Sequence, residues 1–132
     1  MSFSWRTYLD LANELVSFES ESHYRAAISR AYYSVYNVLR IRAGYSNRDP
    51  KSNHKNFINS LKNPTDKLYY KFSFQERSDL VMIGNELDYL REGRNEADYD
   101  SSIIIKKSKC ILLIKKVERI FEMLDEADEL IS

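Results

Sequence analysis

The residues best suited to chemistry lie in the segment 90–99 (LREGRNEADY), where an arginine occupies a core position. Four apolar residues upstream repeat with the three- and four-residue spacing of one helical face: Leu80, Ile83, Leu87 and Leu90. The next position on this face is Arg94, whose charge needs an acceptor or a ligand when it is buried. Asp98 follows one helical turn later. The spacing fits either an Arg94–Asp98 pair at the end of a core helix or a polar site in a helical bundle.

A second candidate pattern is Ser29–Tyr33 (SRAYY), in which Arg30 and Tyr33 lie about one helical turn apart. One interpretation is a helix surface with aromatic packing. The other is a contact to nucleic acid, because arginine binds phosphate and tyrosine stacks on bases. From these residues alone, the structural interpretation is favoured.

Other kinds of site find little support in the sequence. His23 and His54 are far apart, and Cys110 has no nearby partner, so no metal-binding pattern is present and no cofactor is expected. We expect both histidines at the surface or at helix caps. The single cysteine excludes an intrachain disulfide, and its apolar neighbours predict a buried, inert thiol. Glycine-rich phosphate loops and serine nucleophile motifs are also missing from the sequence.

Composition narrows the class of protein. The 132 residues fit one domain, 1–132, and twenty basic residues balance twenty acidic ones. Any RNA contact would therefore need a local patch rather than a long-range field. Ten tyrosines suit half-buried places such as interfaces. Because no apolar run resembles a signal peptide or a membrane span, we expect a soluble, cytoplasmic protein that does not enter a membrane.

Hydrophobic periodicity predicts an all-α fold, an up-and-down bundle of four or five helices. Only three glycines and two prolines interrupt the chain, which favours long helices. Ser4 is expected to cap the first helix and Gly44 to end the second. The expected helices span residues 4–16, 22–43, 53–61, 74–97 and 101–130, with a loop at 47–52. The aromatic segment 67–74 is ambiguous and is read as a short helix that leads into a connection.

Gly84 and Gly93 lie inside the expected helix 74–97, where each costs about 1 kcal/mol relative to alanine. Gly93, directly before Arg94, predicts a local kink or a close backbone approach. The last helix has lysines in its first half and acidic residues in its last turns, opposite to what the helix dipole favours. We therefore expect neighbouring groups, a partner chain or solvent to set these charges.

Two segments together resemble the HEPN superfamily of small helical proteins. Residues 24–36 (YRAAISRAYYSVY) are similar to the family's long second helix, with its Ser-Arg/Lys-Ala-Tyr-Tyr run. Residues 90–99 are similar to the late Leu-Arg-x-x-Arg-Asn/His-x-Ala-Asp-Tyr segment of one prokaryotic branch. Asn53-His54-Lys55 lies where that branch often has a histidine that opens a short third helix. The resemblance covers nearly the whole chain in helix order.

The resemblance implies an up-and-down bundle that forms a homodimer, with the arginine motifs of two chains meeting in a cleft. In active members, an arginine, a polar residue and a histidine four to six residues later form a metal-independent ribonuclease site. Such a site works by general acid–base and cationic assistance. Many members are toxins paired with a nucleotidyltransferase-like antitoxin, or act in phage defence.

Residue by residue, Arg94 matches the motif arginine and Asn95 its polar neighbour, while Tyr99 stands in the place of the histidine. A tyrosine with an ordinary pKa near 10 is a poor general base, so His54 is a candidate for the imidazole. The tyrosine that some toxins have modified corresponds to Ser101 here. The candidate catalytic residues are Arg94, Asn95, Tyr99 and His54, and the candidate substrate-binding residues are Arg30, Tyr33, Arg91 and Asp98.

Three functions remain open at this point. A toxin or defence ribonuclease would lose RNA cleavage in Arg94→Ala. A non-catalytic HEPN module would bind a nucleotide, RNA or partner protein through the same arginine. A purely structural partner would present its tyrosines at an interface, and Arg94→Ala would cost about 3–5 kcal/mol of stability if a buried pair were broken.

Overall fold

The computed structural model describes residues 3–45 and 53–131, and these residues form helices and connections without a β-strand. Five α-helices are longer than one turn, and a 3₁₀ helix and a one-turn α-helix lie between them. In chain order the elements are α1 (Thr7–Val16), α2 (Glu21–Arg42), α3 (His54–Leu61), η1 (Lys67–Lys71), α4 (Phe74–Arg77), α5 (Leu80–Tyr99) and α6 (Lys107–Ile131).

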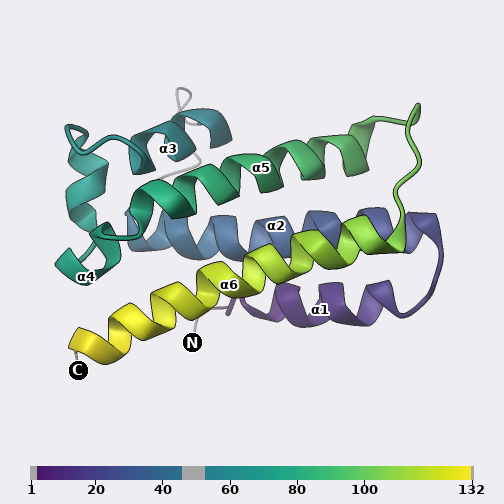
Figure 1. Ribbon diagram of the computed structural model, residues 1–132, viewed down its shortest axis with the longest axis horizontal. Helices are drawn as coiled ribbons and strands as arrows, with labels where there is room; N and C mark the ends of the chain where they lie inside the picture. Colours follow the sequence, from purple (N-terminus) through teal and green to yellow (C-terminus); the bar gives the residue numbers. More distant parts are fainter. Residues whose placement is uncertain (1–2, 46–52, 132) are drawn as a thin grey trace.

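Helices α1, α2, α5 and α6 run alternately in opposite directions along the long axis of the molecule (Figure 1). Helix α2 is central and packs on α1, α5 and α6, while α3 packs on α5. The segment from α3 to α4 fills the connection between α2 and α5 at one end of the bundle (Figure 1). The predicted all-α, up-and-down helical bundle is confirmed.

Local side-chain chemistry explains several helix ends. Ser20 caps α2 by accepting a hydrogen bond from the His23 backbone, and Asn53 caps α3 in the same way. Gly44 has a φ of +66° directly after the end of α2, in the left-handed region that favours glycine. The predicted Ser4 cap is wrong. Helix α1 begins at Thr7, and Ser4 contributes only its carbonyl, which accepts from the Thr7 backbone amide.

Two predicted helix boundaries are corrected. The expected helix 74–97 begins at a Ser73–Glu76 capping box, but a turn at Ser78 and Asp79 divides it into α4 and α5. The last helix begins at Lys107 rather than at residue 101. The Asp100 carboxylate accepts hydrogen bonds from the backbone amide and hydroxyl of Ser102, which holds the chain in a turn instead.

Both glycines of α5 are positions of close approach, which for Gly93 is one of the two predicted alternatives. A Cβ atom on Gly93 would lie 2.7 Å from the Leu113 side chain of α6, and one on Gly84 would lie 2.7 Å from Lys62. Helix α6 therefore packs directly on the α5 backbone next to Arg94. Cys110 of α6 is fully buried, which confirms its predicted place in the core, and burial raises the pKa of its thiol to about 11.

Candidate functional site

Arg94 is buried, with only 9% of its surface exposed, although it keeps a full positive charge. Its Nη1 lies 3.7 Å from Oδ2 of Asp98, so the predicted ion pair is present but long. Among the described residues its Nε is buried without any hydrogen-bond partner. Buried polar atoms are nearly always paired, so this unused donor marks Arg94 as unusual. The structure thus shows the ion pair and, at the same residue, one buried donor without a partner among the described residues.

Three tyrosine rings surround the Arg94 guanidinium. Its central carbon lies 5.5 Å from the ring centre of Tyr32, 5.4 Å from that of Tyr33 and 5.8 Å from that of Tyr99. Arginine is attracted to the faces of aromatic rings at such distances. Tyr32 is fully buried and Tyr99 is 77% exposed, so the cluster reaches from the core of the bundle to its surface.

His54, the first residue of α3, joins this cluster. Its ring stacks on Tyr36 with the ring centres 3.9 Å apart, and its Nδ1 lies 2.8 Å from the Tyr32 hydroxyl. Burial, together with the charges of Arg94 and Arg91, lowers the pKa of His54 to about 4, so the ring is neutral at pH 7. Burial strongly raises the pKa of Tyr32, which keeps its proton. The Tyr32 hydroxyl and Nδ1 of His54 therefore share one hydrogen bond between two neutral groups.

The remaining predicted residues lie around this centre. Arg91 donates to Asp88 one turn back on α5, at 3.3 Å. The central guanidinium carbon of Arg30 lies 5.0 Å from the ring centre of Tyr8 and 6.0 Å from that of Tyr33, on the side towards α1. Asn95 is half-buried, and within the described part of the chain its side chain makes no hydrogen bond. The structure thus brings His54, Tyr33, Asp98 and Tyr99 together around Arg94, with Arg91 and Arg30 at the edges.

Three residues of α2 in the cluster were not among the predicted site residues. The Ser29 hydroxyl donates to Asp98 at 3.2 Å, on the carboxylate oxygen that faces Arg94. Tyr32 and Tyr36 form the stacked wall against which His54 lies. The four-residue spacing of these tyrosines in the run YYSVY was the available signal, since such spacing places two side chains on one face of a helix.

Arg25 of α2 fixes the end of α5 beside the cluster. Its guanidinium donates to four backbone carbonyls and to the Glu21 carboxylate at 2.9 Å. The carbonyls belong to Glu96, Ala97, Asp100 and Ile103. A shallow surface pocket lies between Arg25 and Tyr99, next to Asp98. Arg25 thereby holds the residues on which both Asp98 and Tyr99 depend for their positions.

Within residues 3–45 and 53–131 we find no cluster of histidine, cysteine and carboxylate side chains suited to hold a metal ion. Every helix in that part of the chain is also too short or too polar to cross a membrane. The side chains of the cluster offer guanidinium groups, a neutral imidazole and phenolic hydroxyls. These groups can bind an anion and stack on aromatic rings.

Comparisons of the chain with family models, with curated proteins and with solved structures returned no match. The likeness to HEPN proteins therefore rests on the two sequence segments that resemble that family.

Proposed function

We propose that this chain is a HEPN-like module in which the Arg94 cluster binds a phosphate-bearing ligand, RNA or a nucleotide. The observation that carries the proposal is the buried Nε of Arg94, which lacks a partner among the described residues. A phosphate oxygen is a strong acceptor for such a donor, because guanidinium and phosphate match in charge and geometry.

The surroundings of Arg94 support a ligand with both phosphate and base. The Asp98 carboxylate is 3.7 Å away, too far for a strong charged hydrogen bond, so a phosphate can compete for the guanidinium. The Tyr99 ring is exposed beside it and offers a face on which a base can stack. One chain therefore supplies both contacts that a nucleotide needs.

RNA cleavage in a toxin–antitoxin or phage-defence system is the second candidate function. It is favoured by the position of His54, which contacts the Tyr32 and Tyr33 rings that also face Arg94. Cleavage needs a group that accepts a proton from the ribose hydroxyl. The Nδ1 of His54 is already bonded to Tyr32, and its lowered pKa makes it a weak base. Binding is therefore better supported than cleavage.

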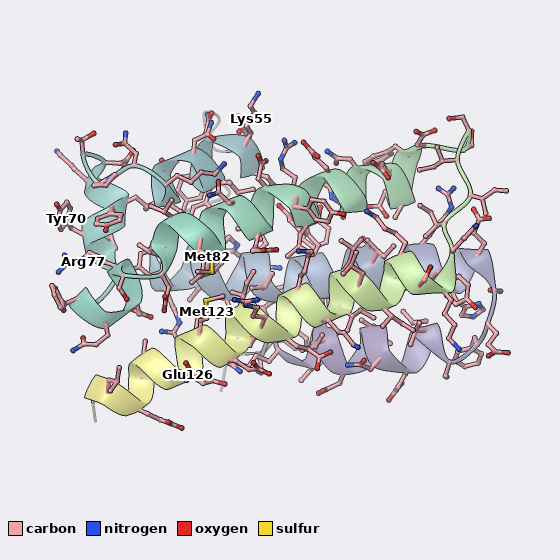
Figure 2. All side chains as sticks on the ribbon, in the orientation of Figure 1. Lys55, Tyr70, Arg77, Met82, Met123 and Glu126 are labelled. Atoms are coloured by element: carbon pink, nitrogen blue, oxygen red, sulfur yellow. The ribbon has the colours of Figure 1, made fainter. Side chains whose placement is uncertain are left out.

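The test is binding of a labelled single-stranded RNA, and of individual nucleotides, to the purified chain in EDTA. We expect Arg94→Met to weaken binding about tenfold to a hundredfold, the effect of losing a charged hydrogen bond. Arg77→Met on α4, at the opposite end of the bundle in Figure 2, is the matched control and should bind like the wild type. Equal binding by the wild type and Arg94→Met contradicts the proposal.

The same samples test cleavage. RNA that stays intact with the wild type supports a binding module, whereas cleavage that is lost in Arg94→Met and His54→Gln supports a ribonuclease. The homodimer with facing arginine motifs and the nucleotidyltransferase-like antitoxin belong to this proposal as well. Chemical crosslinking between two copies through residues near Tyr99 tests the first of these.

A further inference from the structure

The outer face of α6 has a regular pattern that the Arg94 cluster does not involve. Six exposed residues repeat with alternating spacings of four and three, which keeps them on one line along the helix. This outer seam consists of Ser108, Leu112, Lys115, Arg119, Glu122 and Glu126. The opposite face of α6, which includes Leu113, Val117 and Leu124, is buried in the bundle. A spacing of four and three is also the spacing by which two helices pack along each other.

The four charged residues of the seam make no ion pair within the described part of the chain. Their neighbours do: Lys116 pairs with Glu86 of α5, and Asp128 pairs with Arg42 of α2. The unpaired charges are also ordered unfavourably. Lys115 and Arg119 are like charges one turn apart, and so are Glu122 and Glu126. The basic residues come first in the helix, against its dipole. The monomer thus keeps charges that nothing within it compensates.

We propose that the outer seam binds a second copy of this chain, with the two α6 helices antiparallel. When the two-fold axis passes between Ile120 and Phe121, Lys115 of one copy lies opposite Glu126 of the other. In the same register Arg119 lies opposite Glu122. Symmetry repeats both pairs, so all four seam charges of each copy face an opposite charge. The order that is unfavourable in one chain is complementary in two.

Apolar residues close the ends of this contact. Leu112 is 45% exposed and Leu130 is 75% exposed. In the antiparallel register Leu112 of one copy lies within one residue of the level of Leu130 of the other. Exposed apolar side chains at both ends of a charged seam would exclude water from the pairs between them. Glu126 lies at the edge of this face, where it lines a surface pocket together with Phe74 and Gln75 of α4.

This interface differs from the expected HEPN-type dimer, in which the arginine motifs of two chains meet. No residue of the Arg94 cluster lies on α6, so the seam can be altered without changing the cluster. The inference therefore does not depend on the proposed function. Because exposed charges form most of the contact, association should be weak and should decrease with salt.

The experiment uses two charge-reversal variants of the whole chain, K115E/R119E and E122K/E126K, in sedimentation velocity. The wild type should associate through the seam at low ionic strength, in addition to any contact made through the arginine motifs, and this association should weaken by about tenfold or more in about 0.5 M NaCl. Each variant alone places like charges opposite one another. Its dimer should therefore have a dissociation constant about tenfold or more higher than that of the wild type. Their equimolar mixture restores every opposite-charge pair and should form a heterodimer.

A third variant with all four reversals should form a homodimer again, since its charges are complementary in the same register. Circular dichroism checks that each variant keeps its helix content. The proposal is overturned if the wild type stays monomeric at low salt, or if both single-sided variants dimerise like the wild type. It is also overturned if the wild type dimerises but the mixture does not.

Discussion

Two arginines at the same interface between α2 and α5 have opposite surroundings. Arg25 of α2 donates to one carboxylate and four backbone carbonyls, so its guanidinium is fully engaged. Arg94 of α5 is more deeply buried, with 11% of its side chain exposed against 20% for Arg25, yet it has one long ion pair and an unused Nε. The two arginines thus differ less in burial than in the degree to which their donors are satisfied.

The largest expected effect on stability comes from replacing Arg25, whose donors are paired. Arg25→Met would remove the side-chain donor of four backbone carbonyls, of which that of Glu96 keeps its bond from the Asp100 amide, and we expect a loss of about 2–4 kcal/mol. Urea denaturation measures it. Glu21→Gln, which removes only the half-exposed partner, should cost much less. A loss below about 1 kcal/mol in Arg25→Met would show that the carbonyls find other partners.

A change in pH tests the electrostatic side of the Arg94 cluster. The pKa of His54 is about 4 in the folded protein and 6.5 ordinarily, so the unfolded chain takes up the proton first as the pH falls. Stability should be complete above pH 6.5 and decrease from there towards pH 4. We expect a loss of about 1–2 kcal/mol, reduced from the full shift because the ring is only partly buried.

His54→Gln should remove this part of the pH dependence of stability. An NMR titration of the His54 ring gives the pKa directly, and Arg94→Met should raise it because a nearby positive charge is removed. A His54 ring that titrates near 6.5 in the folded wild type would contradict the expectation.

Arg94, which keeps an unpaired donor, should contribute little to the free energy of unfolding. In Arg94→Met the new side chain fills much of the same space without a charge to desolvate, so we expect a change within about 1 kcal/mol of the wild type. The comparison with Arg25→Met under identical denaturation conditions sharpens the contrast between the two residues. A loss of about 3–5 kcal/mol would instead favour a purely structural role for Arg94.

The smallest effect is expected at a pair that is neither buried nor part of a site. Lys107 lies 3.1 Å from Glu19, and both side chains are exposed. Lys107→Gln should change the free energy of unfolding by no more than about 0.5 kcal/mol. Thermal denaturation of this variant gives the baseline against which the two arginines are judged.

Much of this arrangement could be predicted from the sequence. The helical spacing of Leu80 to Leu90 placed Arg94 at a core position, and the structure has it there, with Asp98 as its partner. The glycine at position 93 indicated a close approach, which Leu113 provides. The position of Arg94 follows from periodicity within one helix, and the close approach at Gly93 follows from the cost of a glycine inside a helix. Both can be read directly from the residues.

The contacts between helices could not be predicted in the same way. The bonds from Arg25 of α2 to the carbonyls near the end of α5 join residues about seventy positions apart. Backbone carbonyls have no sequence signature, so nothing in the residues pointed to them. The ion pair between Glu76 and Arg42 of α2 likewise joins residues far apart in the sequence, and nothing in the residues pointed to it.

Because His54 belongs to α3 and Arg94 to α5, the cluster joins an element of the α2–α5 connection to the main bundle. Amide hydrogen exchange should therefore divide the site in two. The amides of the central helix α2 should exchange only on global unfolding, whereas those of α3 should exchange through a smaller opening that separates the imidazole from the guanidinium. A ligand that binds both the imidazole and the guanidinium would slow exchange in α3 more than in α2. It would thereby stabilise α3 against local opening.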